Sequence, residues 1–369
     1  MMHGCGQGVP QDYSMAYEWY LKGADLGNET AQENVGVLYE CGYGVKQDYN
    51  KALEWYLKAA DQGLSTAQSS VGLLYYYGRG IEKDHSKALV WFRKAADQGH
   101  ALAQSWVAHC YWGGHGVSKD PKKAFEWYLK AAKQGDTTSQ FEVGNMYHNG
   151  DGIPQDYRQA MSWYFKAADK GHSKAQNMVG MMYYDGEGVT TNYPQAFEWY
   201  LKAAEQGNIN SQFNVAQFFY EGTGVRQNYS KALEWYHKAA AQGSDTAQSG
   251  LGTMYMRGHG VPQDYTKALE WHLKAANQGN VTSQVWVGCI CENGLGVVQD
   301  FRAAMAWFLM AAEQENAEAQ NAIGFLHNWG HGVPQDLGKA MVWYLKAASH
   351  GHENAKKNIE LLFLSGYRS

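Results

Sequence analysis

The chain has 369 residues, of which 45% are apolar and 14% aromatic, so it has ample material for a folded core. Its net charge is −5 at pH 7 and its charges are spread along the chain, which argues against a nucleic-acid partner. No apolar run approaches the length needed to cross a bilayer, so we expect no insertion into a membrane.

The first residues carry no export signal, because residues 1–9 have neither a basic n-region nor an apolar h-region. They match sequence columns that recur at residues 181–189. We therefore interpret residues 1–8 as the remnant of a preceding repeat. Either the start codon lies within an array or the chain is a fragment of a longer one.

The chain is a repeat array, because tryptophan recurs every 36 residues without insertion or deletion. The positions are Trp19, Trp55, Trp91, Trp127, Trp163, Trp199, Trp235, Trp271, Trp307 and Trp343. Around each tryptophan, apolar residues fall at helical spacing, as at Tyr49, Ala52, Leu53, Tyr56 and Ala60. The pattern predicts a helix near residues 13–25 and at each multiple of 36 beyond, which we name the WY helix. We expect its tryptophan to be a buried, stabilising residue.

Each WY helix has recognisable start and stop signals. An Asp or Asn that can cap the first turn precedes every copy: Asp12, Asp48, Asp84, Asp120, Asp156, Asn192, Asn228, Asp264, Asp300 and Asp336. Gly63 and its equivalents follow the helix and can adopt the left-handed conformation of a C-terminal cap. Glu315 replaces this glycine in the ninth copy, so we expect a differently capped corner there.

The second half of each unit predicts another helix, near residues 29–41 in the same series, which we name the AQ helix. Ala67, Val71, Leu74 and Tyr75 form its apolar stripe in the second copy. Gly72 lies in the middle of this helix despite a propensity cost of about 1 kcal/mol, which indicates that a neighbouring helix approaches closely. No segment has the pattern of a strand, so the chain is predicted to be all-α.

One pair of short helices cannot bury its apolar surfaces alone, so neighbouring pairs must stack into an α/α solenoid. We expect residues 1–369 to form a single solenoid of about ten repeats. Residues 353–369 should form a C-terminal capping helix and tail, because Lys356 and Glu360 replace the Gln and Gly of the other copies.

The consensus G-x-G-V-x-x-D-Y-x-K-A-L-E-W-Y-x-K-A-A-x-x-G, followed by A-Q-x-x-V-G-x-x-Y-x-x-G, resembles the Sel-one-like repeat family, a relative of the tetratricopeptide repeat. The resemblance covers essentially the whole chain. It implies a right-handed superhelix of antiparallel helix pairs that acts as an adaptor or scaffold for protein complexes. It leaves the pathway and the partner open.

Residues for catalysis or metal binding form no convincing pattern. The five cysteines, Cys5, Cys41, Cys110, Cys289 and Cys291, are odd in number, and we interpret them as reduced thiols. The histidine pairs do not reach the ligand count of a zinc site, and no nucleotide-binding fingerprint follows a strand. We expect neither an enzyme nor a bound cofactor or metal.

A partner surface is suggested by columns that vary between repeats while the WY columns barely change. By resemblance to the tetratricopeptide repeat, the AQ helix lines the concave groove, and its outward positions are rich in aromatic residues. The predicted partner-binding residues are Tyr76, Tyr77, Trp112, Phe141, His148, Tyr184, Phe213 and Tyr220. Packing between repeats is the competing explanation for some of them.

Two functions therefore remain open. The first is a scaffold or adaptor that holds a protein or peptide in its groove, and the second is a structural spacer without a specific ligand. We expect a cytoplasmic location. Asn28, Asn228 and Asn280 each begin an Asn-x-Ser/Thr sequon, so a signal peptide upstream would instead indicate a luminal or secreted quality-control adaptor. The oligomeric state is left open.

Overall fold

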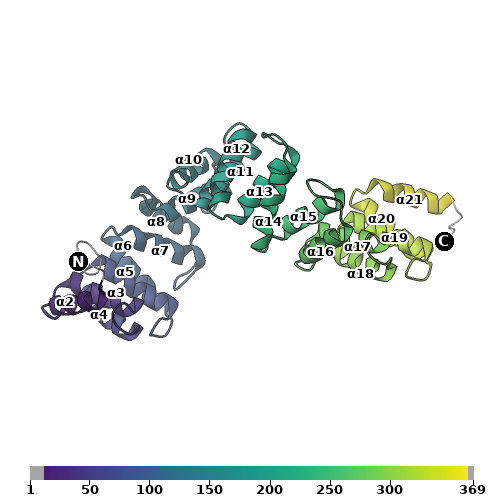
Figure 1. Cartoon of the computed structure of the whole chain (residues 1–369). Coiled ribbons are helices and arrows are strands. Elements are labelled where there is room, and N and C mark those ends of the chain that lie inside the picture. Colours follow the sequence, from purple (N-terminus) through teal and green to yellow (C-terminus); the bar gives the residue numbers. More distant parts are fainter. Residues whose placement is uncertain (1–11, 365–369) are drawn as a thin grey trace. The chain divides into compact units, whose positions relative to one another are not determined.

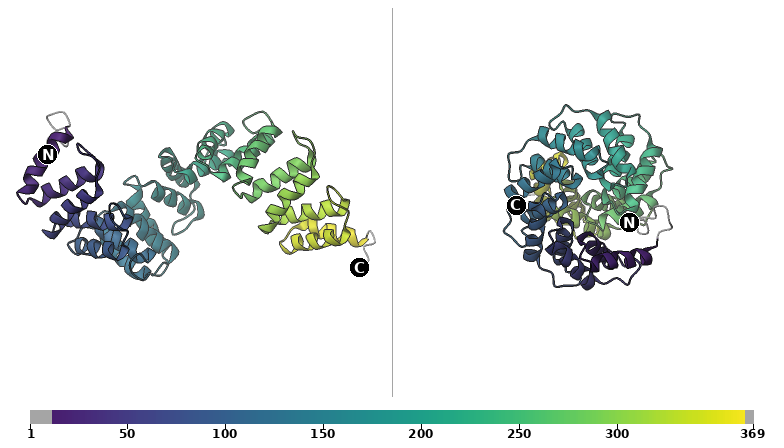
Figure 2. Two further views of the ribbon diagram at one scale, coloured as in Figure 1. Left: turned by 90° about the horizontal axis from the view of Figure 1, so that it is seen from below. Right: turned by 90° about the vertical axis from the view of Figure 1, so that its left-hand side faces the viewer.

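The computed structural model describes residues 12–364, and these residues form 20 helices, α2 to α21, and no strand (Figure 1). The expected remnant at residues 1–8 lies outside them. The chain divides into two compact units, with α2–α11 in the first and α12–α21 in the second. Within each unit, helices of neighbouring repeats lie side by side (Figure 2). The prediction of an all-α solenoid of stacked helix pairs is confirmed.

The helices alternate between the two predicted types. The WY helices are α2 (Tyr13–Asp25), α4 (Tyr49–Asp61), α6 (His85–Asp97), α8 (Pro121–Lys133), α10 (Tyr157–Ala168), α12 (Tyr193–Glu205), α14 (Tyr229–Ala241), α16 (Tyr265–Ala276), α18 (Phe301–Glu313) and α20 (Leu337–Ser349). The AQ helices are α3 (Glu29–Cys41), α5 (Ser65–Tyr77), α7 (Ala101–Gly113), α9 (Thr137–Asn149), α11 (Ser173–Asp185), α13 (Ile209–Glu221), α15 (Asp245–Arg257), α17 (Val281–Asn293), α19 (Ala317–Trp329) and α21 (Glu353–Leu364).

The predicted caps hold both ends of the WY helices. In α6, for example, Asp84 Oδ1 accepts a hydrogen bond of 2.9 Å from the backbone N–H of Lys87, which satisfies a donor that the first turn leaves unpaired. Gly63 follows α4 with a φ of 96°. The differently capped corner expected after α18 is wrong, because Glu315 adopts a positive φ of 61° and keeps the hydrogen bond to the carbonyl of Ala312 that glycine makes in other repeats; among residues 12–364 it is the residue other than glycine with positive φ.

The sequon asparagines have the same structural role as these caps. Asn28, Asn228 and Asn280 each accept a hydrogen bond from a backbone N–H three residues later, at the start of α3, α14 and α17. N-cap preference for asparagine therefore explains their presence without glycosylation.

The tryptophan of the WY helix is not the core residue that we expected. Trp163 and Trp199 are buried, but Trp55, Trp91 and Trp127 are only half-buried. The fully buried ring belongs to the next residue along the chain, as in Tyr56, Phe92, Tyr128, Tyr164, Tyr236, Phe308 and Tyr344. Because one residue turns a helix by about 100°, the tryptophan lies at the edge of the buried stripe. There it packs against the preceding repeat, and a lysine one turn later covers it, as Lys58 Nζ does at 3.7 Å from the Trp55 ring centre.

The mid-helix glycines mark the closest helix contact, as predicted. A Cβ atom on Gly72 would lie 2.6 Å from Cδ1 and Cε1 of Phe92 on the following WY helix. Gly36, Gly144, Gly252, Gly288 and Gly324 face the corresponding ring in the same way. Within each unit, an AQ helix that is followed by a WY helix accordingly packs more extensively on that helix than on the preceding one, as α5 does on α6.

A ladder of buried glutamines also joins the repeats, and the sequence reasoning had not identified it. Gln68 Nε2 donates to the carbonyl of Ala60 at the end of α4, at 3.2 Å. Its Oε1 accepts a hydrogen bond of 2.8 Å from Gln98 Nε2 at the end of α6. After α10, Lys170 replaces the donating glutamine, and Gln140 Oε1 on α9 is left buried without a hydrogen bond. The ladder supplies polar partners inside an otherwise apolar interface.

The helix α21 carries the predicted substitutions, but its outer surface is less polar than we expected. Lys356 and Glu360 are exposed on α21, where other AQ helices bury Gln and Gly. The same helix exposes Leu361, Phe363 and Leu364, the last at 83%. The prediction of a polar capping helix was therefore wrong.

Candidate interaction surface

The positions that vary lie on one side of the AQ helices. We define the AQ face as the second, fifth, sixth, ninth and twelfth residues of each AQ helix. In α7 these are Leu102, Ser105, Trp106, His109 and Trp112, whereas in α13 they are Asn210, Phe213, Asn214, Gln217 and Tyr220. The third, fourth, seventh and tenth residues are buried in both helices. These AQ helices thus have a buried side whose positions stay apolar or small, with one glutamine, and an AQ face whose residues differ from repeat to repeat.

Hollows open on this face between consecutive AQ helices. One of about 240 Å³ lies between α7 and α9, lined by Trp106, His109 and Glu142. A second of about 390 Å³ lies along α13, α15 and the start of α17. Others lie between α17 and α19, at about 290 Å³, and between α19 and α21, at about 520 Å³. Their walls come mainly from AQ-face residues.

The predicted partner-binding residues differ in accessibility. Tyr77 and Tyr184 are exposed, at 50% and 40%. Trp112, Phe141, His148, Phe213 and Tyr220 are half-buried. The outward position expected for Tyr76 is wrong, because its side chain is only 9% exposed and its ring lies against Phe92 and Trp106.

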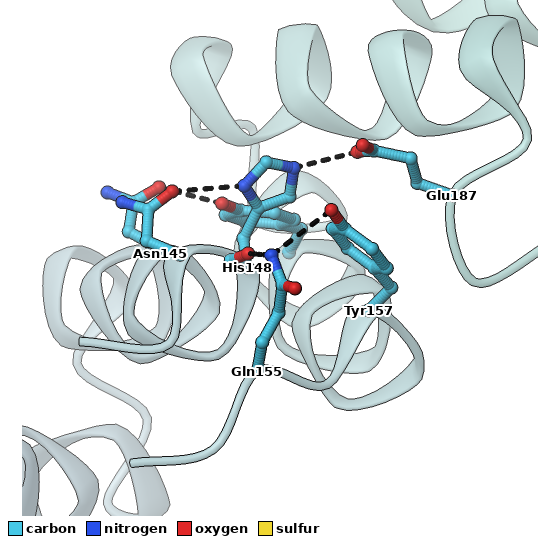
Figure 3. Close-up of polar contacts among 7 residues, drawn as sticks. Asn145, His148, Gln155, Tyr157 and Glu187 are labelled. Atoms are coloured by element: carbon cyan, nitrogen blue, oxygen red, sulfur yellow. Dashed lines mark hydrogen bonds and ion pairs between the residues drawn. The ribbon is translucent and has the colours of Figure 1, made fainter. Parts of the chain in front are cut away.

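In α3, α9 and α13, the twelfth residue contacts the linker that follows the next AQ helix. His148 Nε2 lies 2.8 Å from Glu187 Oε2, an ion pair when the histidine is protonated (Figure 3). In the same way, Glu40 Oε1 lies 3.5 Å from a guanidinium nitrogen of Arg79. Tyr220 Oη also lies 3.1 Å from His259 Nδ1. Each linker residue follows its partner by 39 positions and lies between two glycines.

This pairing changes the interpretation of the variable columns. The two members of each pair change together, from Glu40 with Arg79 to His148 with Glu187. Variation at the twelfth position is therefore explained in part by contacts between repeats. Comparing columns 39 residues apart would have revealed this signal in the sequence.

The surroundings of His148 show how firmly such a residue is held. Its ring lies 5.2 Å from that of Tyr157, edge to face. The side chain of Gln155 reaches back from the linker and donates to the carbonyl oxygen of His148 at 2.6 Å (Figure 3). The hydroxyl of buried Tyr164 donates to Asn145 Oδ1 at 2.8 Å, and burial raises the pKa of that tyrosine. These contacts order the AQ face at this repeat and leave His148 little freedom to adapt to a partner.

Comparison with known proteins identifies the repeat. The model of the Sel1 repeat matches ten segments: residues 1–28, 30–64, 65–100, 101–136, 137–172, 173–208, 209–244, 246–280, 281–316 and 317–352. The chain belongs to the Sel1 repeat family. This family generally consists of non-catalytic scaffolds for protein interactions.

Two solved Sel1 repeat structures are similar over most of the chain. One is described as a protective antigen present in uropathogenic Escherichia coli strains, displaying an SLR fold. It is 36% identical, with a TM-score of 0.90, and the match covers 99% of this chain and 78% of that one. A Sel1 repeat protein from Oxalobacter formigenes is 32% identical, with a TM-score of 0.65, over 84% of this chain and 90% of that one. The comparison with curated proteins gave no match.

A histidine cluster that the sequence had not indicated lies where α6, α7 and the linker after α7 meet. The ring of His115 lies 5.1 Å from that of His85 and 5.5 Å from that of His109. His109 Nε2 lies 3.0 Å from Tyr76 Oη. Burial lowers the pKa values of His85 and His109, and the neighbouring histidines lower them further. The three rings pack against one another at the junction between repeats.

The Sel1 repeats offer little for acid–base or nucleophilic chemistry. Cys41, Cys110, Cys289 and Cys291 are free thiols, and burial raises the pKa values of Cys110 and Cys289 to about 12. Such thiols are poor nucleophiles near neutral pH. Across residues 12–364, no group of three or more His, Cys, Asp or Glu side chains is placed to hold a metal ion. None of the helices in this range is both long and apolar enough for a bilayer crossing.

Proposed function

We propose that the chain is a non-catalytic adaptor that binds a protein or peptide partner along the groove formed by its AQ faces. The observation that carries this proposal is that, within each unit, hollows lie between consecutive AQ helices and have walls built largely from variable residues. Variable residues around preformed hollows can give specificity without disturbing the constant interior.

Two residues that the sequence had suggested remain well suited to such contacts. Tyr77 and Tyr184 are exposed, so their rings gain little from folding. Covering an aromatic side chain at the centre of an interface can contribute ~2 kcal/mol or more. We include Trp112, Phe141 and Phe213 as secondary contacts because their rings are half-buried. His148, Tyr76 and Tyr220 serve mainly to join repeats.

The proposal is tested by measuring saturable binding to a recombinant partner first obtained by proximity labelling. The interface variant combines Tyr77→Ala with Tyr184→Ala. The matched control combines Val90→Ala with Leu345→Ala, which removes exposed apolar side chains from WY helices.

We expect the tyrosine variant to bind at least tenfold more weakly and the control to bind normally, with all proteins melting within a few degrees of one another. Equal affinity of both variants would place the interface away from Tyr77, the last residue of α5, and from Tyr184 on the AQ face of α11. Failure to find any saturable partner would favour the structural spacer.

A further inference from the structure

Two AQ faces carry a tryptophan that stacks on the buried ring of the preceding WY helix. In α7, the ring of Trp106 lies 5.5 Å from that of Phe92, at an interplanar angle of 13°. In α17, the ring of Trp286 lies 6.0 Å from that of His272, at an angle of 21°. Both tryptophans are the sixth residue of their AQ helix. The sixth position of an AQ helix can therefore hold a flat ring that stacks on the buried ring of the preceding WY helix.

The seventh repeat has no side chain in that place. The sixth residue of α15 is Gly250, and the preceding buried ring is Tyr236. A Cβ atom on Gly250 would lie 2.8 Å from Tyr236 Cε1. A side chain at this position would therefore crowd the ring of Tyr236, and Gly250 leaves that space open. Beside it lies the hollow of about 390 Å³, walled by Tyr236, Phe213 and Thr253.

The side chains that line this hollow indicate what kind of ligand it can bind. The side chains that line this hollow are uncharged at neutral pH. Several of their polar groups are already used within the chain. Tyr236 donates to Gln217 Oε1 at 2.6 Å, and Thr253 donates to the carbonyl of Ser249 at 3.0 Å. Asn280 accepts from the N–H of Ser283 at 2.9 Å and donates to Asp245 at 2.9 Å.

A charged group would therefore lose its hydration here without gaining a counter-ion. A saccharide would find few polar groups that are not already engaged. A flat, largely apolar ring needs only contact with the faces of Phe213 and Tyr236, whose centres lie 5.9 Å apart. The volume is at the small end of the range of ligand pockets, which suits one side chain better than a larger molecule.

We propose that this hollow, which we name the Gly250 pocket, binds a single aromatic side chain of the partner polypeptide. The incoming ring takes the place that Trp106 and Trp286 fill in their own repeats. The inference rests on the proposed adaptor function and adds the kind of residue that the partner must present.

The test uses N-acetyl-tryptophanamide and N-acetyl-tyrosinamide as probes of the full chain. Thr246, Thr253 and Thr282 line the pocket, so their methyl groups, labelled with ¹³C, report binding at this site by NMR. We expect saturable ring-current shifts of these three methyl groups, while threonine methyl groups elsewhere remain unshifted. N-acetyl-alaninamide and methyl glucoside serve as the comparison probes.

Two variants and one matched control locate the effect. Phe213→Ala removes one wall and should weaken probe binding by about 3- to 10-fold. Thr253→Phe places in the pocket a residue that the same column already carries as Phe325, and it should abolish the shifts at Thr246 and Thr282. The control is Phe125→Ala, because Phe125 on α8 lies 5.3 Å from Tyr147, away from the pocket and outside the proposed partner surface. It should leave binding unchanged.

Equal shifts in the wild type and Phe213→Ala would overturn the inference, as would tighter binding of methyl glucoside than of the aromatic amides. Absence of any probe-induced shift would also overturn it. The adaptor proposal would survive each of these results if the Tyr77 and Tyr184 variant still lost its partner. If the probes bind as expected but no partner binding depends on the AQ face, the adaptor proposal is wrong, whereas the proposal that the Gly250 pocket binds an aromatic side chain is retained.

Discussion

Replacing Gly72 by alanine tests the close contact that joins each AQ helix to the following WY helix. The added Cβ would lie 2.6 Å from Phe92, whose ring cannot easily move away because Trp106 stacks on it. Overpacking of this kind costs about 1–3 kcal/mol. Alanine also improves helix propensity by about 1 kcal/mol, so the net loss of stability should be at most about 2 kcal/mol.

The sign of the effect should depend on the ring. In a Phe92→Ala background the obstacle is gone, and Gly72→Ala should stabilise the protein by about 1 kcal/mol. Because repeat arrays can unfold locally, urea unfolding followed by circular dichroism should be accompanied by hydrogen exchange of α5 and α6. The control is Ala108→Gly, where the column already holds alanine and only helix propensity, about 1 kcal/mol, should be lost.

The reasoning would be refuted if Gly72→Ala stabilised the wild type and the Phe92→Ala background equally. Equal effects would mean that no steric coupling exists between these two positions. If Gly72→Ala alone stabilised the protein, close packing would not explain why glycine recurs at this position of the AQ helices.

Four further outcomes follow from individual residues. Lys170→Gln should give buried Gln140 its missing hydrogen bond and raise the free energy of unfolding by about 1 kcal/mol, measured by urea titration. Glu315→Gly should stabilise by about 1 kcal/mol, since it removes a positive φ of 61° from a residue with a Cβ, and the gain should appear in the melting temperature. His272→Tyr should remove an acid sensitivity. The histidine is buried with its pKa lowered to about 4, so protons bind the unfolded state preferentially and wild-type stability should fall from about pH 6.5 to pH 4 by up to ~3 kcal/mol. Trp163→Ala should cost about 3–5 kcal/mol in urea unfolding, because this tryptophan is buried.

Each outcome has its own check. Lys170→Ala should give no gain, since it adds no donor to the ladder. The Glu315→Ala variant keeps a Cβ, so a gain equal to that of glycine would contradict the strain argument. If wild type and His272→Tyr lost stability in parallel between pH 6.5 and pH 4, the buried imidazole would not be responsible. Trp127→Ala removes a half-buried ring and should cost less than Trp163→Ala; equal losses would contradict the different burial of the two tryptophans.

The sequence alone determined the repeat length, the helix boundaries and the caps. These features depend on contacts within a few residues, such as Asp84 with Lys87, and ten copies in register make the pattern unambiguous. The close approach at Gly72 could also be predicted, because a costly residue recurs where only a steric reason explains it.

Only the tertiary structure decided which rings are buried and which variable residues are available to a partner. The periodic pattern could not separate Trp91 from Phe92, since neighbouring residues differ only in which edge of the helix meets the next repeat. The pairing of His148 with Glu187 and the hollow beside Gly250 arise where columns of different repeats meet in space. Such contacts depend on how the repeats are stacked, and no single repeat contains that information.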